Sequence, residues 1–120
     1  MHEIISPRGF RGVQFRDSHG NLCTVSQSSA TDLTGQPPGA SFLWVGVVDA
    51  HPQILQQDAV ALGLMDDPGG QLTGWVDYTI PEEVLLHTQM HLSRKQVAEL
   101  IQLLSSWLET NRFSEEATDG

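Results

Sequence analysis

The C-terminal part of the sequence carries an amphipathic pattern that constrains the fold more than any other stretch. Ser93 and Gln96 form a capping box, in which each side chain satisfies a free amide of a first helical turn. Asn111 suits a left-handed C-terminal stop. Apolar residues recur between these ends at helical spacing and give one apolar face: Val97, Leu100, Ile101, Leu104, Trp107 and Leu108. The pattern predicts a long helix that needs a partner surface, and none of its residues is chemically reactive.

The residues before this helix have the patterns of an antiparallel sheet. Residues 12–16 and 22–27 predict a hairpin around turn-forming residues 17–21, and residues 1–11 predict an arm or a first edge strand. Residues 42–48 are apolar at both parities, which predicts a central strand covered on both faces. Gly46 within that strand indicates close approach by another backbone or a ligand.

The middle of the chain predicts shorter elements. A short helix is expected after Asp49, with Pro52 in its first turn and Gly63 at its end. Strands are expected at 75–80 and 84–92. The sum is an α+β fold: a small antiparallel sheet packed against one long C-terminal helix, with a short helix inserted after the central strand. We expect one domain over residues 1–112 and an acidic tail over 113–120.

Composition narrows the cellular setting. The single cysteine, Cys23, cannot form an internal disulfide, which favours a reducing compartment. No apolar run approaches the ~20 residues of a membrane span, and the first residues lack the features of a signal peptide. These features predict a cytoplasmic protein.

The charges are distributed unevenly. The chain has 15 acidic and 6 basic residues, for a net charge of −9. No lysine or arginine lies between Arg16 and Arg94, and this span holds nine carboxylates: Asp17, Asp32, Asp49, Asp58, Asp66, Asp67, Asp77, Glu82 and Glu83. Such a surface repels nucleic acid and anionic membranes and suits a basic partner protein. Solubility alone is the simpler explanation of an acidic surface.

Residues suited to catalysis or metal binding are present without a recognisable arrangement. His87 and His91 would chelate a metal from one face of a helix, but on the predicted strand they lie ~13 Å apart. The serines, Cys23 and the five histidines show no nucleophile motif. We therefore expect no enzyme activity, no metal and no cofactor.

The first turn of the C-terminal helix carries two basic residues, Arg94 and Lys95, where the helix dipole disfavours cations. In one interpretation, acids such as Glu82 or Glu83 neutralise them. In the other, the helix amides, both basic side chains and the Ser93 hydroxyl bind a phosphate.

Three aromatic side chains offer a stacking surface beside such an anion site. Trp75 and Tyr78 lie among polar neighbours, whereas Trp44 lies in an apolar strand and is better explained by core packing.

Several segments resemble a family of small uncharacterised proteins encoded by tailed bacteriophages and prophages: 17–20, 28–29, 43–46, 74–84 and 90–97. The likeness covers residues 12–113, and its most specific part is Met90-His91-Leu92-Ser93 leading into the helix. The family pattern has arginine before this methionine and glycine after Thr110, where this chain has Gln89 and Asn111. The resemblance implies a phage accessory protein made in the host bacterial cytoplasm, and it supplies no catalytic residue or ligand.

Small accessory proteins without catalytic groups act mostly by binding, which gives three hypotheses. The first is a counter-defence protein that sequesters a host nucleotide second messenger, of cyclic or ADP-ribose type, as a homo-oligomer. Its ligand-binding residues would be Trp75, Tyr78, His91, Ser93, Arg94 and Lys95. The second is an acidic inhibitor that occupies a basic, nucleic-acid-binding surface of a host defence protein. The third is an accessory protein without a ligand. None of them binds nucleic acid or membrane directly.

Overall fold

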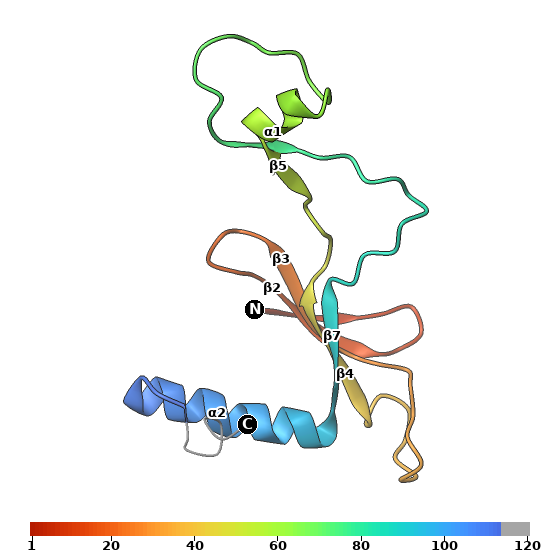
Figure 1. Cartoon of the computed structure of the whole chain (residues 1–120). Coiled ribbons are helices and arrows are strands. Elements are labelled where there is room, and N and C mark those ends of the chain that lie inside the picture. The colour runs from red at the N-terminus through yellow and green to blue at the C-terminus, as the bar shows by residue number, and fades with distance from the viewer. Residues whose placement is uncertain (114–120) are drawn as a thin grey trace. The chain divides into compact units, whose positions relative to one another are not determined.

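A computed structural model describes residues 1–113 of the chain (Figure 1). The described residues form two compact units. The first unit comprises residues 1–48 and the chain from Thr88 onward, and the second unit comprises Asp49–His87. The expectation of one domain over residues 1–112 stays a prediction. The expected acidic tail lies outside the described residues, apart from Phe113.

The first unit is built on a five-stranded antiparallel sheet with the strand order β1-β2-β3-β4-β7. These strands are β1 (His2–Ile5), β2 (Arg11–Arg16), β3 (Leu22–Gln27), β4 (Phe42–Val47) and β7 (Gln89–Ser93). The predicted edge strand and hairpin are confirmed. Apolar and polar residues alternate along β2 and β7, and successive side chains of a strand point to opposite faces of the sheet. This alternation favours a sheet in which one face is more buried than the other.

The turn between β2 and β3 is held by one carboxylate. Asp17 accepts hydrogen bonds from the backbone N–H groups of His19 and Asn21, both at 2.9 Å. The backbone N–H of Asn21, followed by its side-chain amide, lowers the pKa of the Asp17 carboxyl below its ordinary value.

β4 differs from its prediction in position and in covering. It is an inner strand, but β3 is the middle strand of the five, because β1 and β2 extend the sheet on one side and only β7 extends it on the other. Its side chains are half-buried and Trp44 is exposed, so the expected covering of both faces is wrong. The prediction for Gly46 is confirmed: a Cβ atom there would collide with the carbonyl oxygen of Thr88 and lie 2.7 Å from Cα of Gln89.

The long helix, α2, spans Arg94–Thr110 and has the predicted caps. The Ser93 hydroxyl accepts a hydrogen bond from the Gln96 backbone N–H at 3.2 Å, and the Gln96 side chain accepts one from the Ser93 N–H at 3.0 Å. Asn111 has φ 60° and stops the helix in the left-handed conformation. The α+β fold class is confirmed.

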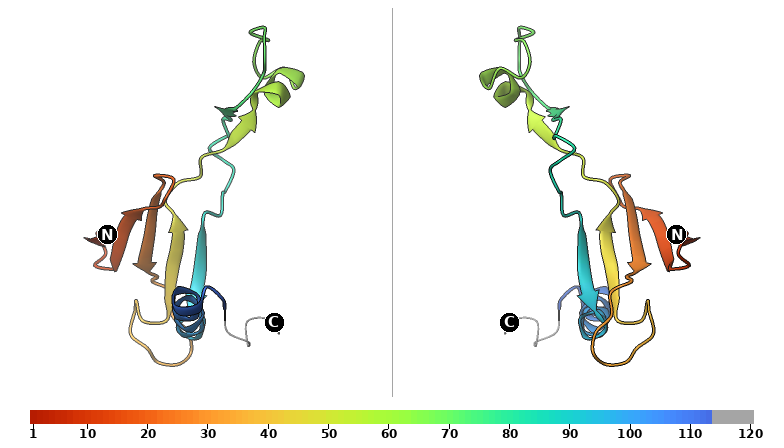
Figure 2. Two further views of the ribbon diagram at one scale, coloured as in Figure 1. Left: turned by 90° about the vertical axis from the view of Figure 1, so that its left-hand side faces the viewer. Right: turned by 90° about the vertical axis from the view of Figure 1, so that its right-hand side faces the viewer.

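The apolar face of α2 is covered less than its pattern predicts. No residue of α2 is fully buried; Val97 and Leu100 are half-buried, whereas Ile101 and Leu108 are exposed. The cause is the junction with β7, which ends at Ser93, the residue before α2 begins. No loop lets the helix fold back along the sheet, so α2 lies across the end of β7 (Figure 2).

The second unit contains the strand pair β5 (Gln53–Leu55) and β6 (Trp75–Asp77), with α1 (Gln56–Ala61) following β5. The short helix is confirmed, but Pro52 precedes a strand and not a helix, because residues 53–55 pair with β6. Gly63, with φ 74°, follows the helix end as predicted.

Two of the expected strands are shorter in the structure. The strand predicted at 75–80 ends at Asp77, and the strand predicted at 84–92 begins at Gln89. None of the helices within residues 1–113 combines the length and the apolar character needed to cross a membrane.

Candidate functional site

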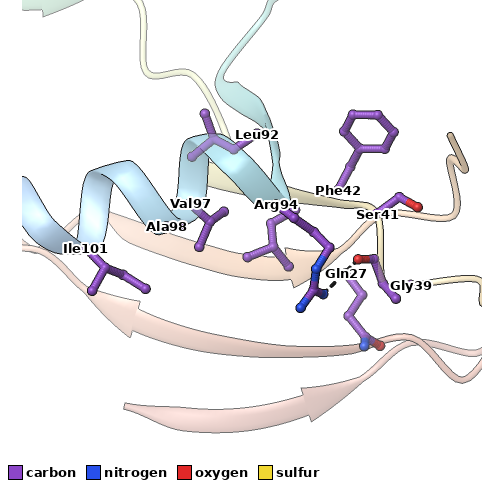
Figure 3. Close-up of a pocket in the computed structure, with 11 residues that line it drawn as sticks. Gln27, Gly39, Ser41, Phe42, Leu92, Arg94, Val97, Ala98 and Ile101 are labelled. Atoms are coloured by element: carbon purple, nitrogen blue, oxygen red, sulfur yellow. Dashed lines mark hydrogen bonds between the residues drawn. The ribbon is translucent and has the colours of Figure 1, made fainter. Parts of the chain in front are cut away.

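A groove of about 390 Å³ opens in the first unit beside the start of α2 (Figure 3). One wall is the first two turns of the helix, and the other is β4 with the loop before it. The residues that line it are Gln27, Gly39, Ala40, Ser41, Phe42, Leu43, Leu92, Arg94, Val97, Ala98 and Ile101. The groove is mostly apolar, with the guanidinium of Arg94 at its edge. Its volume falls in the range of small-molecule sites, about 300–1,000 Å³.

Arg94 turns toward the loop before β4. Its Nη1 donates a hydrogen bond to the carbonyl oxygen of Ala40 at 2.9 Å. Within the described residues of the first unit, Arg11 and Glu3 form an ion pair at 3.3 Å. Arg94 forms no ion pair with a carboxylate of these residues. The positive charge of Arg94 therefore lies beside the groove with a carbonyl dipole as its partner. Neutralisation of Arg94 and Lys95 by Glu82 or Glu83 stays a prediction.

Ser41 lines the groove, and its hydroxyl group is buried. The residue is 1% exposed, and its Oγ has no hydrogen-bond partner among residues 1–113. In Figure 3 this oxygen points away from Arg94. The pKa of the Asp32 carboxyl is lowered mainly by hydrogen bonds from Thr34. The Ser41 hydroxyl has only a minor effect on that pKa, because it does not form a regular hydrogen bond with that carboxyl.

His91 lies in an aromatic cluster. Its ring stacks on Phe42 with the centroids 4.7 Å apart, and the Trp44 ring lies 4.2 Å away in a tilted arrangement. Its Nε2 forms a hydrogen bond of 2.9 Å with the hydroxyl of buried Ser28. Because neighbouring residues of a strand point to opposite faces, His91 faces away from Leu92, which lines the groove.

The structure thus brings together only part of the predicted ligand site. Ser93, Arg94 and Lys95 lie side by side where α2 begins. His91 is engaged with Ser28, and Trp75 and Tyr78 belong to the second unit, where both are exposed. The six-residue site stays a prediction.

Metal ligands do not cluster in the described chain. Among residues 1–113, no three side chains of His, Cys, Asp or Glu lie close enough to hold an ion. In the second unit, His51 Nε2 pairs with the Asp77 carboxylate at 3.0 Å, and both side chains are largely exposed. The expectation that His87 and His91 share one strand is wrong, because His87 precedes β7.

The second unit combines negative charge with exposed apolar side chains. It carries seven carboxylates and no lysine or arginine: Asp49, Asp58, Asp66, Asp67, Asp77, Glu82 and Glu83. Its only fully buried apolar residue among those described is Ala59. Its exposed large apolar side chains are Leu62, Leu64, Trp75, Tyr78, Val84, Leu85 and Leu86. This surface is suited to a partner that supplies both positive charge and apolar contact.

Comparisons with protein-family models, with curated proteins and with solved structures find no match for this chain.

Sequence reasoning missed two features of the site. The groove depends on Leu43 and Leu92, which face each other across β4 and β7, and no local pattern identifies such a pair. Ser28 as the partner of His91 was also missed, because 63 positions separate them in the chain. The capping box was the one local signal that placed the start of α2 correctly.

Proposed function

We propose that the protein is a non-enzymatic binding protein whose second unit docks onto a basic surface of another protein. The observation that carries this proposal is the coexistence, within Asp49–His87, of seven carboxylates, no lysine or arginine and a set of exposed large apolar side chains. Solubility explains exposed carboxylates, but it does not explain exposed tryptophan and leucine beside them.

The physical roles of the two components differ. The carboxylates steer a basic partner toward the unit and exclude nucleic acid and anionic membranes. Exposed apolar groups such as Trp75, which is 63% exposed, and Leu85 then supply the contacts that hold the complex, since aromatic anchors dominate binding energies. In the phage setting that the resemblance implies, the partner is a host defence protein, and the basic surface is the one that it uses for nucleic acid.

The test uses the full chain as bait in an extract of the bacterial host, followed by binding measurements on the purified partner. We expect a nucleic-acid-binding partner that double-stranded DNA displaces and that binds more weakly as salt rises. Changing Asp66→Asn, Asp67→Asn, Glu82→Gln and Glu83→Gln together should weaken binding about tenfold to hundredfold.

The matched control is Glu99→Gln with Glu109→Gln, which removes charge from exposed positions of α2. This control should leave the affinity within about twofold of the wild type. Equal affinities for the wild type and the four-residue variant, or a partner that DNA does not displace, would contradict the proposal.

Nucleotide sequestration is the second candidate, and the groove beside Arg94 favours it. Arg94 lies at the positive end of α2 and has no carboxylate partner among the described residues of the first unit, so it offers a contact for a phosphate. A ligand that binds the folded chain raises its melting temperature. A screen of cyclic and ADP-ribose-type nucleotides should then show a rise that Arg94→Glu with Lys95→Glu abolishes. If no nucleotide in that panel raises the melting temperature, this candidate is wrong and the first is unaffected.

A further inference from the structure

The second half of α2 presents an apolar stripe to the surroundings. Ile101 is 59% exposed, Trp107 49% and Leu108 75%, and Leu104 between them is also exposed. A helix of 17 residues spans about 25 Å, and most of the stability of a helix in a protein comes from packing of its apolar face. The stripe therefore needs a covering surface that the described first unit does not provide.

The sheet of the first unit also has few fully buried apolar side chains. Cys23 is the only apolar residue of the first unit, within its described part, that is fully buried. Val45 is half-buried and Met90, its neighbour across β4 and β7, is exposed. Because the buried core of this unit is so small, covering its exposed apolar surface would add much to its stability. A partner that stays bound supplies this cover better than a transient one.

The charge distribution makes α2 a part of the chain that a second copy can approach without strong repulsion. The chain as a whole has a net charge of −9, so two copies repel each other over most of their surface. The four charged residues of α2, Arg94, Lys95, Glu99 and Glu109, sum to zero, and the apolar stripe contains no carboxylate.

We propose that α2 pairs in antiparallel orientation with α2 of a second copy, and that Trp107 of each copy fills the groove beside Val97 of the other. The stripe has its large side chains, Trp107 and Leu108, at one end. At its other end, Val97 and Ala98 border the groove of about 390 Å³. Antiparallel pairing places the large side chains of one helix against the small side chains of the other at both ends. It also orients the two helix dipoles in opposite directions. Parallel pairing would instead bring the two Arg94 side chains together.

This pairing predicts specific neighbours. With Leu100 opposite the partner's Leu104, Val97 lies opposite the partner's Trp107 and next to the partner's Leu108. Two copies of Val97 are then separated by about ten residues of helix, or about 15 Å along the axis.

The first measurement is the mass of the full chain in solution by sedimentation. We expect two chains per particle. Trp107→Ala should raise the dimer dissociation constant about 30-fold or more, as the loss of a buried aromatic anchor does. Trp75→Ala is the matched control, since Trp75 is also an exposed tryptophan but lies in the second unit; it should change the constant by less than about threefold. A wild-type chain that stays monomeric up to about 100 μM overturns the proposal.

Cross-linking tests the orientation without relying on the tryptophan. In a Cys23→Ser background, one variant carries Val97→Cys and another carries Leu108→Cys. We expect a disulfide-linked dimer only when the two variants are mixed. Each variant alone should stay uncross-linked, because its two cysteines are too far apart for a disulfide, which needs Cα atoms within about 7 Å. Cross-linking of Val97→Cys with itself shows parallel helices and overturns the proposal, as does a mixture that forms no cross-link. Docking of the second unit on a basic partner does not depend on either result, because that surface lies within Asp49–His87.

Discussion

Replacing Gly46 by alanine should destabilise the protein strongly. The added methyl group would collide with the carbonyl oxygen of Thr88 and approach Cα of Gln89 to 2.7 Å. Both neighbours are backbone, so neither can rotate away as a flexible side chain could. The sheet must therefore open between β4 and β7, or β7 must shift.

The magnitude follows from these two responses. Overpacking in a closely packed site costs about 1–3 kcal/mol, and each backbone hydrogen bond lost in the opening costs about 0.5–1.5 kcal/mol. With two such bonds lost, the free energy of unfolding should fall by about 2–6 kcal/mol. This is a large part of the 5–15 kcal/mol (roughly) that holds a typical domain folded.

Chemical denaturation at one fixed protein concentration measures the change, and hydrogen exchange of the Val45 and Met90 amides locates it at the β4–β7 pair. Gly20→Ala is the control: Gly20 has φ 85° and open space around it, so only the backbone conformation costs energy, about 1 kcal/mol. If Gly46→Ala loses no more stability than Gly20→Ala, the close approach of the two strands is not a constraint and the reasoning fails.

Three further perturbations test individual contacts. Ser93→Ala should cost about 1 kcal/mol of unfolding free energy through loss of the cap, whereas Ser105→Ala, in the helix interior, should be neutral within about 0.5 kcal/mol. His91 is exposed, but His91→Ala removes two aromatic contacts and the hydrogen bond to a buried serine, and should cost about 1–2 kcal/mol in thermal or chemical denaturation. His87→Ala, at an exposed position before β7, is the control. The backbone of its own turn lowers the pKa of Asp17, so its stabilising effect is present above the ordinary carboxyl pKa and is lost as the pH falls through the lowered value. Asp17→Asn should therefore lose less stability than the wild type on acid titration, and equal losses would contradict this.

The elements that sequence reasoning placed correctly are those with local determinants. The capping box fixes the start of α2 because its donors and acceptors lie within four residues, and Asn111 fixes its end in the same way. The hairpin of β2 and β3 depends on the Asp17 turn, which is also local. For such segments the chain neighbours supply most of the free energy of the conformation.

The elements that were misplaced have distant determinants. Residues 84–92 alternate throughout, but β7 begins only at Gln89, because its pairing with β4 runs from Gly46 to Phe42. Residues 53–55 resemble the start of a helix, but their pairing with β6 makes them a strand. A periodic pattern states which conformation suits a segment and not how far its partner extends.

The candidate ligand site shows the same limit for function. The sequence predicts His91 as a ligand contact because Ser93, Arg94 and Lys95 follow it closely. Because side chains alternate along β7, the His91 ring lies on the opposite face of the sheet from Leu92. There it stacks on Phe42 and forms a hydrogen bond with Ser28. Proximity along a strand therefore does not predict a shared pocket, although the three residues at the start of α2 do stay together.

The uneven distribution of charge gives the two proposed surfaces opposite responses to salt. Docking of the second unit on a basic partner depends on attraction between unlike charges, so added salt weakens it. Pairing of α2 depends on apolar contact between chains that each carry a net charge of −9, so added salt screens their repulsion and strengthens it. A series of binding and sedimentation measurements in the same buffers should show the two affinities moving in opposite directions. If both fell together as salt rose, α2 would not pair through its apolar stripe, because charges would then be carrying that contact as well.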